Sequence, residues 1–270
     1  MDDVRVESWA ELTDVLYAGS WKEDLGRFRS DFAFRGLDVP GNELTTGLRQ
    51  LAGERAADLE GHLLRNFRKY AYADAVPADS AWHWLALAQH YGLPTRLLDW
   101  TFSPFVALHF AVEHLEHFGE DGVVWCVDFV RLREFLPRRL RELLSEEGAN
   151  VFTAELLGQA AGRLREFDEL AAEPFVAFFE PASLDQRIVN QFALFSLMSS
   201  PTADLHAWLR GHPDLGRRVV IPHRLKWEVR DKLDQANVTE RVLFPGLDGL
   251  SRWLRRQYMP TSPPRRAKAK

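Results

Sequence analysis

The sequence predicts an α+β fold: a single domain with a mixed, mainly antiparallel sheet flanked by helices. Short segments rich in β-branched and aromatic residues alternate with segments whose apolar residues recur at helical spacing. No stretch rich in Pro, Gly and Ser separates two apolar cores, and no sequence period repeats. We therefore expect about five or six strands, with helices on one or both faces of the sheet.

The first elements are recognised by their end signals. Ser8 with Glu11 forms a capping box for a short helix. Residues 31–35 alternate in polarity and stop at Gly36, as expected of a strand that ends in a turn. Two helices follow, over 59–70 and from Ser80 to a stop at Gly92.

The rest of the chain is expected to alternate strands and helices. Ser103 begins the clearest helix, because it has an N-cap side chain and Pro104 follows at the first helical position. The expected strands are 95–100, 122–130, 174–180, 193–198 and 217–221. The expected helices are 103–117, 131–145, 153–167 and 222–235, with a last amphipathic helix after 243–247.

Composition excludes several classes of protein. The chain has 270 residues and a net charge of −5, from 34 Lys and Arg against 39 Asp and Glu, so no global basic field attracts it to nucleic acid. The single cysteine, Cys126, excludes an internal disulfide framework and fits a reducing compartment. No apolar run approaches the roughly 20 residues that cross a bilayer, and the first residues lack a signal-peptide core. We expect a cytoplasmic protein without a membrane partner.

A change of composition marks the expected end of the domain. Residues 1–258 carry the apolar patterning, whereas 259–270 combine Pro, Ser and basic residues with no apolar face. We expect one domain over 1–258 and a disordered basic tail over 259–270.

The first unusual polar position is Arg35, at the end of an apolar strand in Phe34-Arg35-Gly36. Its planar guanidinium suits carboxylate or phosphate oxygens, and Gly36 allows backbone or ligand to approach closely. The alternative is a structural arginine paired with a core carboxylate such as Asp99. The residues alone leave both interpretations open.

The second unusual place is the run 89–104, QHYGLPTRLLDWTFSP. Thr101 and Ser103 fall on one side of an extended backbone, and the helix that begins at Ser103 directs its unpaired N–H groups toward that side. This arrangement favours an anion. N-capping by Ser103 and an Arg96–Asp99 ion pair form the structural alternative.

The third place is 187–195, RIVNQFALF, where polar residues precede an apolar strand. The amides of Asn190 and Gln191 suit a substrate hydroxyl, and they suit loop carbonyls equally well. Arg187 begins this run. Together with Arg35 and Arg96 it would make a local positive cluster that holds a small anionic ligand despite the acidic average.

No metal site is expected. His114 and His117 are flanked by Glu113 and Glu116 on a helix face expected to be exposed, and no acidic partner motif accompanies them. The sequence also lacks the G-x-S-x-G, P-loop and G-x-G-x-x-G motifs, so common hydrolase, kinase and Rossmann chemistry is unsupported.

Together these places resemble the FRG domain, a bacterial and phage-borne family named for its Phe/Tyr-Arg-Gly motif. The motif here is Phe34-Arg35-Gly36. The resemblance continues through 88–111 (AQHYGLPTRLLDWTFSPFVALHFA), 187–195 (RIVNQFALF) and 242–254 (VLFPGLDGLSRWL), which together extend over nearly all of the chain before the tail.

The order of the motifs is more distantly similar to that of ADP-ribosyltransferases, which implies a related fold and NAD as substrate. In that fold an arginine holds the NAD pyrophosphate and the nicotinamide-side ribose, a Ser-x-Ser element braces the nicotinamide pocket, and a glutamate holds the ribose 2′-hydroxyl. By this resemblance Arg35 takes the arginine role, Thr101-Phe102-Ser103 the Ser-x-Ser role and Gln191 the place of the glutamate. The implied catalytic residues are Arg35 and Gln191, and the implied cofactor-binding residues are Arg35, Gly36, His90, Tyr91, Arg96, Thr101, Phe102 and Ser103, without a metal.

Gln191 departs from the pattern that the resemblance implies. A neutral amide positions a hydroxyl but lacks the negative charge that stabilises a developing cation. Slow turnover, a different acceptor or no activity are therefore open outcomes. Glu180, just upstream, is the candidate that supplies this charge.

The leading functional hypothesis is an NAD-dependent ADP-ribosyltransferase-like effector, of the toxin or antiphage type, that modifies a nucleic acid or a protein. Two alternatives stay open. One is a non-enzymatic module that binds a nucleotide or a partner, and the other is a nuclease that uses His90, Arg96 and Asp99.

Overall fold

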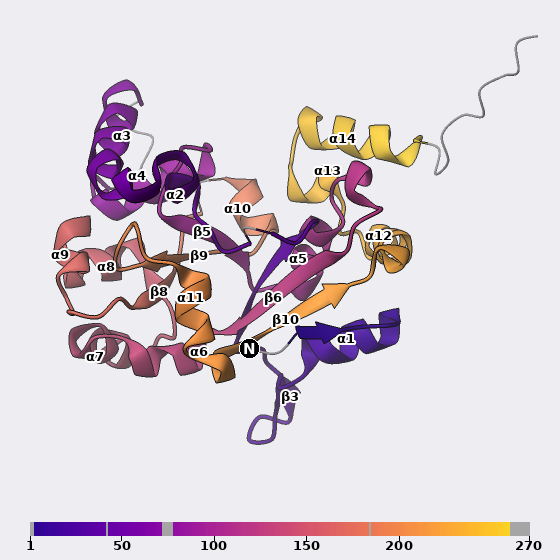
Figure 1. The fold of residues 1–270 in the computed structure, drawn as a ribbon, viewed down its shortest axis with the longest axis horizontal. Coiled ribbons are helices and arrows are strands. Elements are labelled where there is room, and N and C mark those ends of the chain that lie inside the picture. Colours follow the sequence, from indigo (N-terminus) through magenta and orange to yellow (C-terminus); the bar gives the residue numbers. More distant parts are fainter. Residues whose placement is uncertain (1–2, 42, 72–77, 184, 260–270) are drawn as a thin grey trace, which may run out of the picture.

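The computed structural model describes residues 3–41, 43–71, 78–183 and 185–259. An eight-stranded sheet with the order β1-β10-β6-β4-β5-β9-β8-β7 runs through the middle of the molecule (Figure 1). β1 pairs with β10 and β7 with β8 in parallel, whereas the other neighbouring strands of this sheet are antiparallel. The strands are β1 Asp3–Arg5, β4 Phe32–Leu37, β5 Leu97–Thr101, β6 Gly122–Asp128, β7 Phe152–Thr153, β8 Val176–Glu180, β9 Ala193–Met198 and β10 Gly216–Ile221. β2 Trp21–Lys22 and β3 Arg27–Phe28 form a separate hairpin.

Helices flank this sheet, so the predicted α+β class with a mixed, mainly antiparallel sheet is confirmed. The helices are α1 Trp9–Tyr17, α2 Gly47–Ala52, α3 Ala56–Tyr70, α4 Ala81–His90, α5 Pro104–Ala111, α6 Phe129–Leu132, α7 Arg138–Glu146, α8 Ala154–Ala160, α9 Leu164–Asp168, α10 Gln186–Asn190, α11 Leu205–Arg210, α12 Lys226–Gln235, α13 Glu240–Leu243 and α14 Leu247–Gln257. Short 3₁₀ turns include η3 Leu115–His117. None of the helices in these ranges combines the length and hydrophobicity that a bilayer span needs.

Several predicted helices are shorter than the sequence pattern indicated. Pro137 separates α6 from α7, because proline cannot continue a helix that precedes it. The expected helix 153–167 is divided into α8 and α9, and the expected helix 103–117 ends at Ala111, before η3. Of the predicted tail, 260–270 lies outside the described residues.

The two faces of the sheet bury different apolar clusters, as expected from strand alternation. One face packs the aromatic residues Trp100, Trp125 and Phe178 against helices that include α6 and α11. The opposite face holds two clusters. The β10–β6–β4 half packs against α1, α5 and α12, and the β5–β9–β8 half packs against α4, α7, α8 and α9, as the helix positions in Figure 1 show.

The sheet is weakest between β4 and β5, which join its two halves. These strands pair at a single register position, Phe34 with Thr101, whereas β4 pairs with β6 along its whole length. β4 therefore runs alongside β6, and β5 runs alongside β9. Beyond the pair Phe34 and Thr101, β4 and β5 are not paired with each other, which leaves a gap between the two halves of the sheet.

Close packing, rather than ligand approach, explains the glycine of the Phe-Arg-Gly motif. A Cβ atom added at Gly36 would lie 1.7 Å from the carbonyl oxygen of Ala107 in α5. The same helix also crowds Gly122 of β6, where an added Cβ would lie 2.6 Å from the oxygen of Ala111. α5 thus lies directly on β4 and β6, which fixes the strand that carries Arg35.

Candidate functional site

A cleft of about 710 Å³ opens beside the gap in the sheet. Its walls come from Arg35 of β4, Asp99 of β5, the turn after α4, and α10 with the start of β9. A second hollow of about 230 Å³ shares five residues with this cleft: Arg35, Asp99, Arg187, Gln191 and Ala193. The two catalytic residues of the sequence prediction, Arg35 and Gln191, are therefore brought together.

Two backbone carbonyls hold the side chain of Arg35. Its Nε donates to the oxygen of Glu43 at 3.2 Å, and its Nη1 donates to the backbone oxygen of Asp99 at 2.8 Å. Nη2 makes no hydrogen bond to the described residues. Desolvation lowers the pKa of Arg35, and the charge of Asp99 opposes that shift, but an arginine keeps its positive charge. The free edge of this half-buried guanidinium suits an anionic ligand.

A chain of hydrogen bonds fixes the carboxylate of Asp99. The Leu97 amide donates to Thr95 Oγ1 at 3.0 Å, and the Thr95 hydroxyl donates to Gln89 Oε1 at 2.6 Å. Gln89 Nε2 in turn donates to Asp99 Oδ2 at 2.9 Å. The chain of bonds presents a negative charge at a fixed place in the cleft, close to Arg35.

Thr101 and Ser103 connect β5 to Gln191. The Thr101 hydroxyl donates to the backbone oxygen of Gln191 at 2.7 Å and accepts from the Ser103 amide at 3.0 Å. Ser103 caps α5 by accepting from the Val106 amide. Gln191 Nε2 donates to Leu243 O at 2.9 Å, and its Oε1 has no hydrogen bond to the described residues. The two hydroxyls are thus structural: that of Thr101 positions Gln191, whose side-chain oxygen is unused, and that of Ser103 caps α5.

His90, Tyr91 and Arg187 also line the cleft. His90 Nε2 lies 2.7 Å from Asp185 Oδ2, and the exposed Tyr91 ring packs edge-on against the His90 ring. The Arg187 guanidinium lies over the ring of Phe244, 5.1 Å from its centroid. Within the described part of the chain Arg187 forms no ion pair. The lining of the cleft therefore includes Arg187 as a cation without a carboxylate partner among the described residues.

The structure separates Arg96 from the cleft. Its side chain is only 3% exposed, and its guanidinium fork is occupied by Glu60 of α3 and Asp168 of α9. The expected Arg96–Asp99 ion pair is therefore wrong. The predicted positive cluster is reduced to Arg35 and Arg187.

Three other candidates have different surroundings from those expected. Phe102 packs against Phe129 with ring centroids 5.6 Å apart, on the aromatic face of the sheet. Gly36 borders the smaller hollow, although α5 already requires a glycine there. Glu180 ends β8 and lines neither hollow, so it does not supply the missing charge; desolvation raises its pKa.

Sequence reasoning missed part of the cleft wall. Thr45, Gly47 and Gln50 border the cleft from the start of α2 and the turn before it. Their segment carries no recognisable motif, so no signal pointed to them. Gln89 also lies in the wall, and its signal was membership of the polar run 89–104.

The fold and the cleft define the chain as an α+β protein with a polar cleft beside a divided sheet. In the comparison with family models, the FRG domain matches residues 30–120 of the chain. This span includes β4, α4, β5 and α5, whereas Arg187 and Gln191 lie after it. No curated protein and no solved structure gives a significant match to the chain.

Proposed function

We propose that this protein binds NAD in the cleft and transfers ADP-ribose to a nucleic acid or a protein. The observation that carries the proposal is the convergence of Arg35, Asp99 and Gln191, from three separate strands or strand ends, on one cleft. The resemblance to ADP-ribosyltransferases implies this meeting of Arg35 and Gln191. The toxin or antiphage role stays a prediction of the same resemblance.

Two arginines suit the diphosphate of NAD. Arg35 offers the free edge of a guanidinium whose orientation is set by Glu43 and Asp99, and Arg187 offers a second guanidinium in the lining of the cleft. Planar guanidinium groups bind phosphate oxygens by paired, charge-assisted hydrogen bonds. A bound diphosphate would leave the nicotinamide ribose on the side of Asp99 and Gln191.

Transfer breaks the bond between the ribose C1′ and the nicotinamide nitrogen, and the electron pair leaves with nicotinamide. An acceptor nucleophile then forms a bond to C1′ and loses its proton, so the products are ADP-ribosyl acceptor, nicotinamide and a proton. Because positive charge develops on the ribose, a nearby fixed carboxylate lowers the barrier. We assign that charge to Asp99, and we assign orientation of the 2′-hydroxyl to the free oxygen of Gln191.

Incubation of the purified protein with labelled NAD and a cell lysate tests this function. We expect label transfer and nicotinamide release from the wild type, and loss of about 100-fold or more in rate in Asp99→Asn, by analogy with removal of a single charge-stabilising group. Gln191→Ala should also slow turnover. Arg210→Ala, which removes an exposed arginine of α11 outside the cleft, is the control and should turn over normally.

The assay separates the proposal from its alternatives. NAD binding without label transfer or nicotinamide release would contradict the transferase and support a binding module. Degradation of added RNA or DNA would support a nuclease, although the structure places only His90 and Asp99 of the three nuclease candidates at the cleft. Absence of both binding and turnover would overturn the use of NAD altogether.

A further inference from the structure

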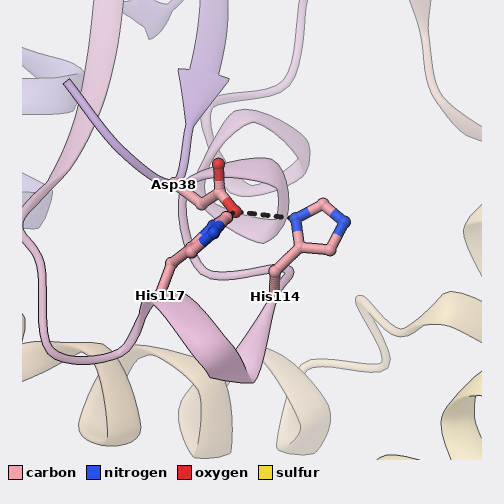
Figure 2. Close-up of side chains that lie close together, drawn as sticks. All are labelled: Asp38, His114 and His117. Carbon is pink, nitrogen blue, oxygen red and sulfur yellow. Dashed lines mark hydrogen bonds and ion pairs between the residues drawn. The ribbon is translucent and has the colours of Figure 1, made fainter. Parts of the chain in front are cut away.

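Outside the cleft, one cluster of side chains has the composition of a metal site. Asp38, His114 and His117 each offer one ligand atom, and these atoms all lie within 4.8 Å of one another. Figure 2 shows both imidazole rings beside the carboxyl group of Asp38. The Nδ1 atoms of His114 and His117 each lie 2.7 Å from Asp38 Oδ2. None of the three residues lines the cleft.

The backbone explains why two histidines face one carboxylate. His114 is the residue before η3 and His117 is its last residue. Side chains three positions apart in a 3₁₀ turn lie nearly eclipsed, so both rings leave the same side of the turn. Asp38 follows directly on β4 and reaches the turn from a strand that is distant in the sequence.

A buried lysine supports both backbones of the cluster. Lys226 is fully buried, and its ammonium donates to the backbone oxygens of Asp38 and His117. The positive charge of Lys226 is directed at these two backbone oxygens. The carboxylates of Glu116 and Glu120 add negative charge around His117, which favours a cation there. The side chains of His114 and His117 are 51% and 38% exposed, so an ion can enter from solvent.

We propose that Asp38, His114 and His117 bind a divalent transition metal ion of the Zn²⁺ type. Two imidazole nitrogens and one carboxylate oxygen form a ligand set that suits Zn²⁺, and a water completes the tetrahedron. Mg²⁺ and Ca²⁺ prefer sites made of oxygen ligands alone. The ion would join the end of β4, the strand that carries Arg35, to the turn after α5. Its chemistry is independent of the NAD proposal.

Calorimetric titration of ZnCl₂ into full-length protein that has been stripped by a chelator tests the site. We expect one Zn²⁺ per chain and a raised melting temperature, because an ion that binds only the folded state stabilises it. His114→Ala and His117→Ala should each weaken Zn²⁺ binding at least about tenfold, since even loss of a supporting group has that effect. Titration of Co²⁺ should give visible absorption bands in the wild type that both variants lose.

The matched control is His223→Ala. His223 is also an exposed histidine beside a carboxylate, with Nδ1 3.4 Å from Asp121 Oδ1, but among the described residues no second histidine joins that pair. This variant should bind Zn²⁺ as the wild type does. If a histidine variant fails to fold, Asp38→Asn provides the same test, because asparagine keeps the size and a carbonyl oxygen but loses the charge. Wild-type Zn²⁺ binding that is absent, or that is unchanged in these ligand variants, would overturn the proposal.

Discussion

Arg35 is oriented by backbone carbonyls, and neither of its hydrogen bonds goes to a carboxylate. The sequence offered two interpretations of this residue, a ligand-binding arginine or an arginine paired with Asp99. The structure combines parts of both, because the partner is Asp99 but the acceptor is its backbone oxygen. The side chain of Asp99 is held by Gln89. Both charges of the pair thus stay available to a ligand.

Gly36 provides a prediction at the residue scale. Gly36→Ala should destabilise the protein by about 1–3 kcal/mol or more, because the new methyl group would overlap the Ala107 carbonyl of α5. Gly61→Ala is the control. Nothing lies within 4 Å of a Cβ at this exposed position of α3, so the change should stabilise the protein by about 0.5–1 kcal/mol. Urea unfolding measures both, and equal stability of Gly36→Ala and the wild type would contradict the close packing of α5 on β4.

His109 gives a second prediction, on pH. Burial, with the charge of Arg230, lowers the pKa of this fully buried histidine to about 3, so the folded protein keeps it neutral. In the unfolded chain it takes up a proton below about pH 6.5. Its contribution to stability is therefore complete above pH 6.5 and is lost as the pH falls toward 3, at no more than about 1.4 kcal/mol per pH unit.

The variant His109→Asn removes this titration and keeps an acceptor near the position of Nδ1, to which Arg230 Nη1 is bonded at 2.8 Å. Unfolding free energies at pH 7 and pH 5 should differ by about 2 kcal/mol less in the variant than in the wild type. An identical pH dependence of the two proteins would show that His109 is not held neutral in the fold.

Among the helices and strands, Arg96 connects the start of β5 to α3 and α9. It stands immediately before β5 and pairs with the buried Glu60 of α3 and the half-buried Asp168 of α9. Arg96→Ala should cost about 3–5 kcal/mol, because it leaves two carboxylates without their cation. The control, Arg165→Ala, breaks an exposed pair with Glu169 on α9 and should cost less than about 1 kcal/mol. A similarly small loss in Arg96→Ala would contradict its structural role.

The helices and strands also show which features of the fold can be predicted from sequence. Ser8, Ser80 and Ser103 each cap the helix that they were expected to begin, because capping depends on neighbours in the chain. β1, β2, β3 and β7 were missed, since strands of two or three residues carry no periodic pattern. The partners of Arg96 lie 36 and 72 residues away from it, and no local signal identifies them.

For the candidate site, the prediction placed Arg35 and Gln191 in one cleft. It also assigned Arg96, Phe102 and Ser103 there, and none of these three lines either hollow. Local spacing shows which side of a strand a residue occupies, but it does not show which other element covers that side. The cluster of Asp38, His114 and His117 illustrates the same limit. His114 and His117 lacked an acidic partner in the sequence, and the fold supplies Asp38 from the end of a different strand.

At the scale of the whole molecule, a net charge of −5 is compatible with the proposed binding of an anion in the cleft. The average charge is acidic, yet Arg35 and Arg187 both border the cleft beside the gap between β4 and β5. If NAD binds as we propose, its electrostatic attraction depends on these two side chains rather than on the field of the whole protein. Removing one of them should weaken binding without changing the fold.

The most direct test of this account is calorimetric titration of NAD into the wild type and Arg187→Ala. We expect saturable binding of one NAD per chain, weakened at least about tenfold in Arg187→Ala, since a charge-assisted hydrogen bond contributes about 1.5–3 kcal/mol. Arg210→Ala should bind NAD as the wild type does. No saturable binding to the wild type, or equal affinity in Arg187→Ala, would contradict the claim that this cleft is an NAD site.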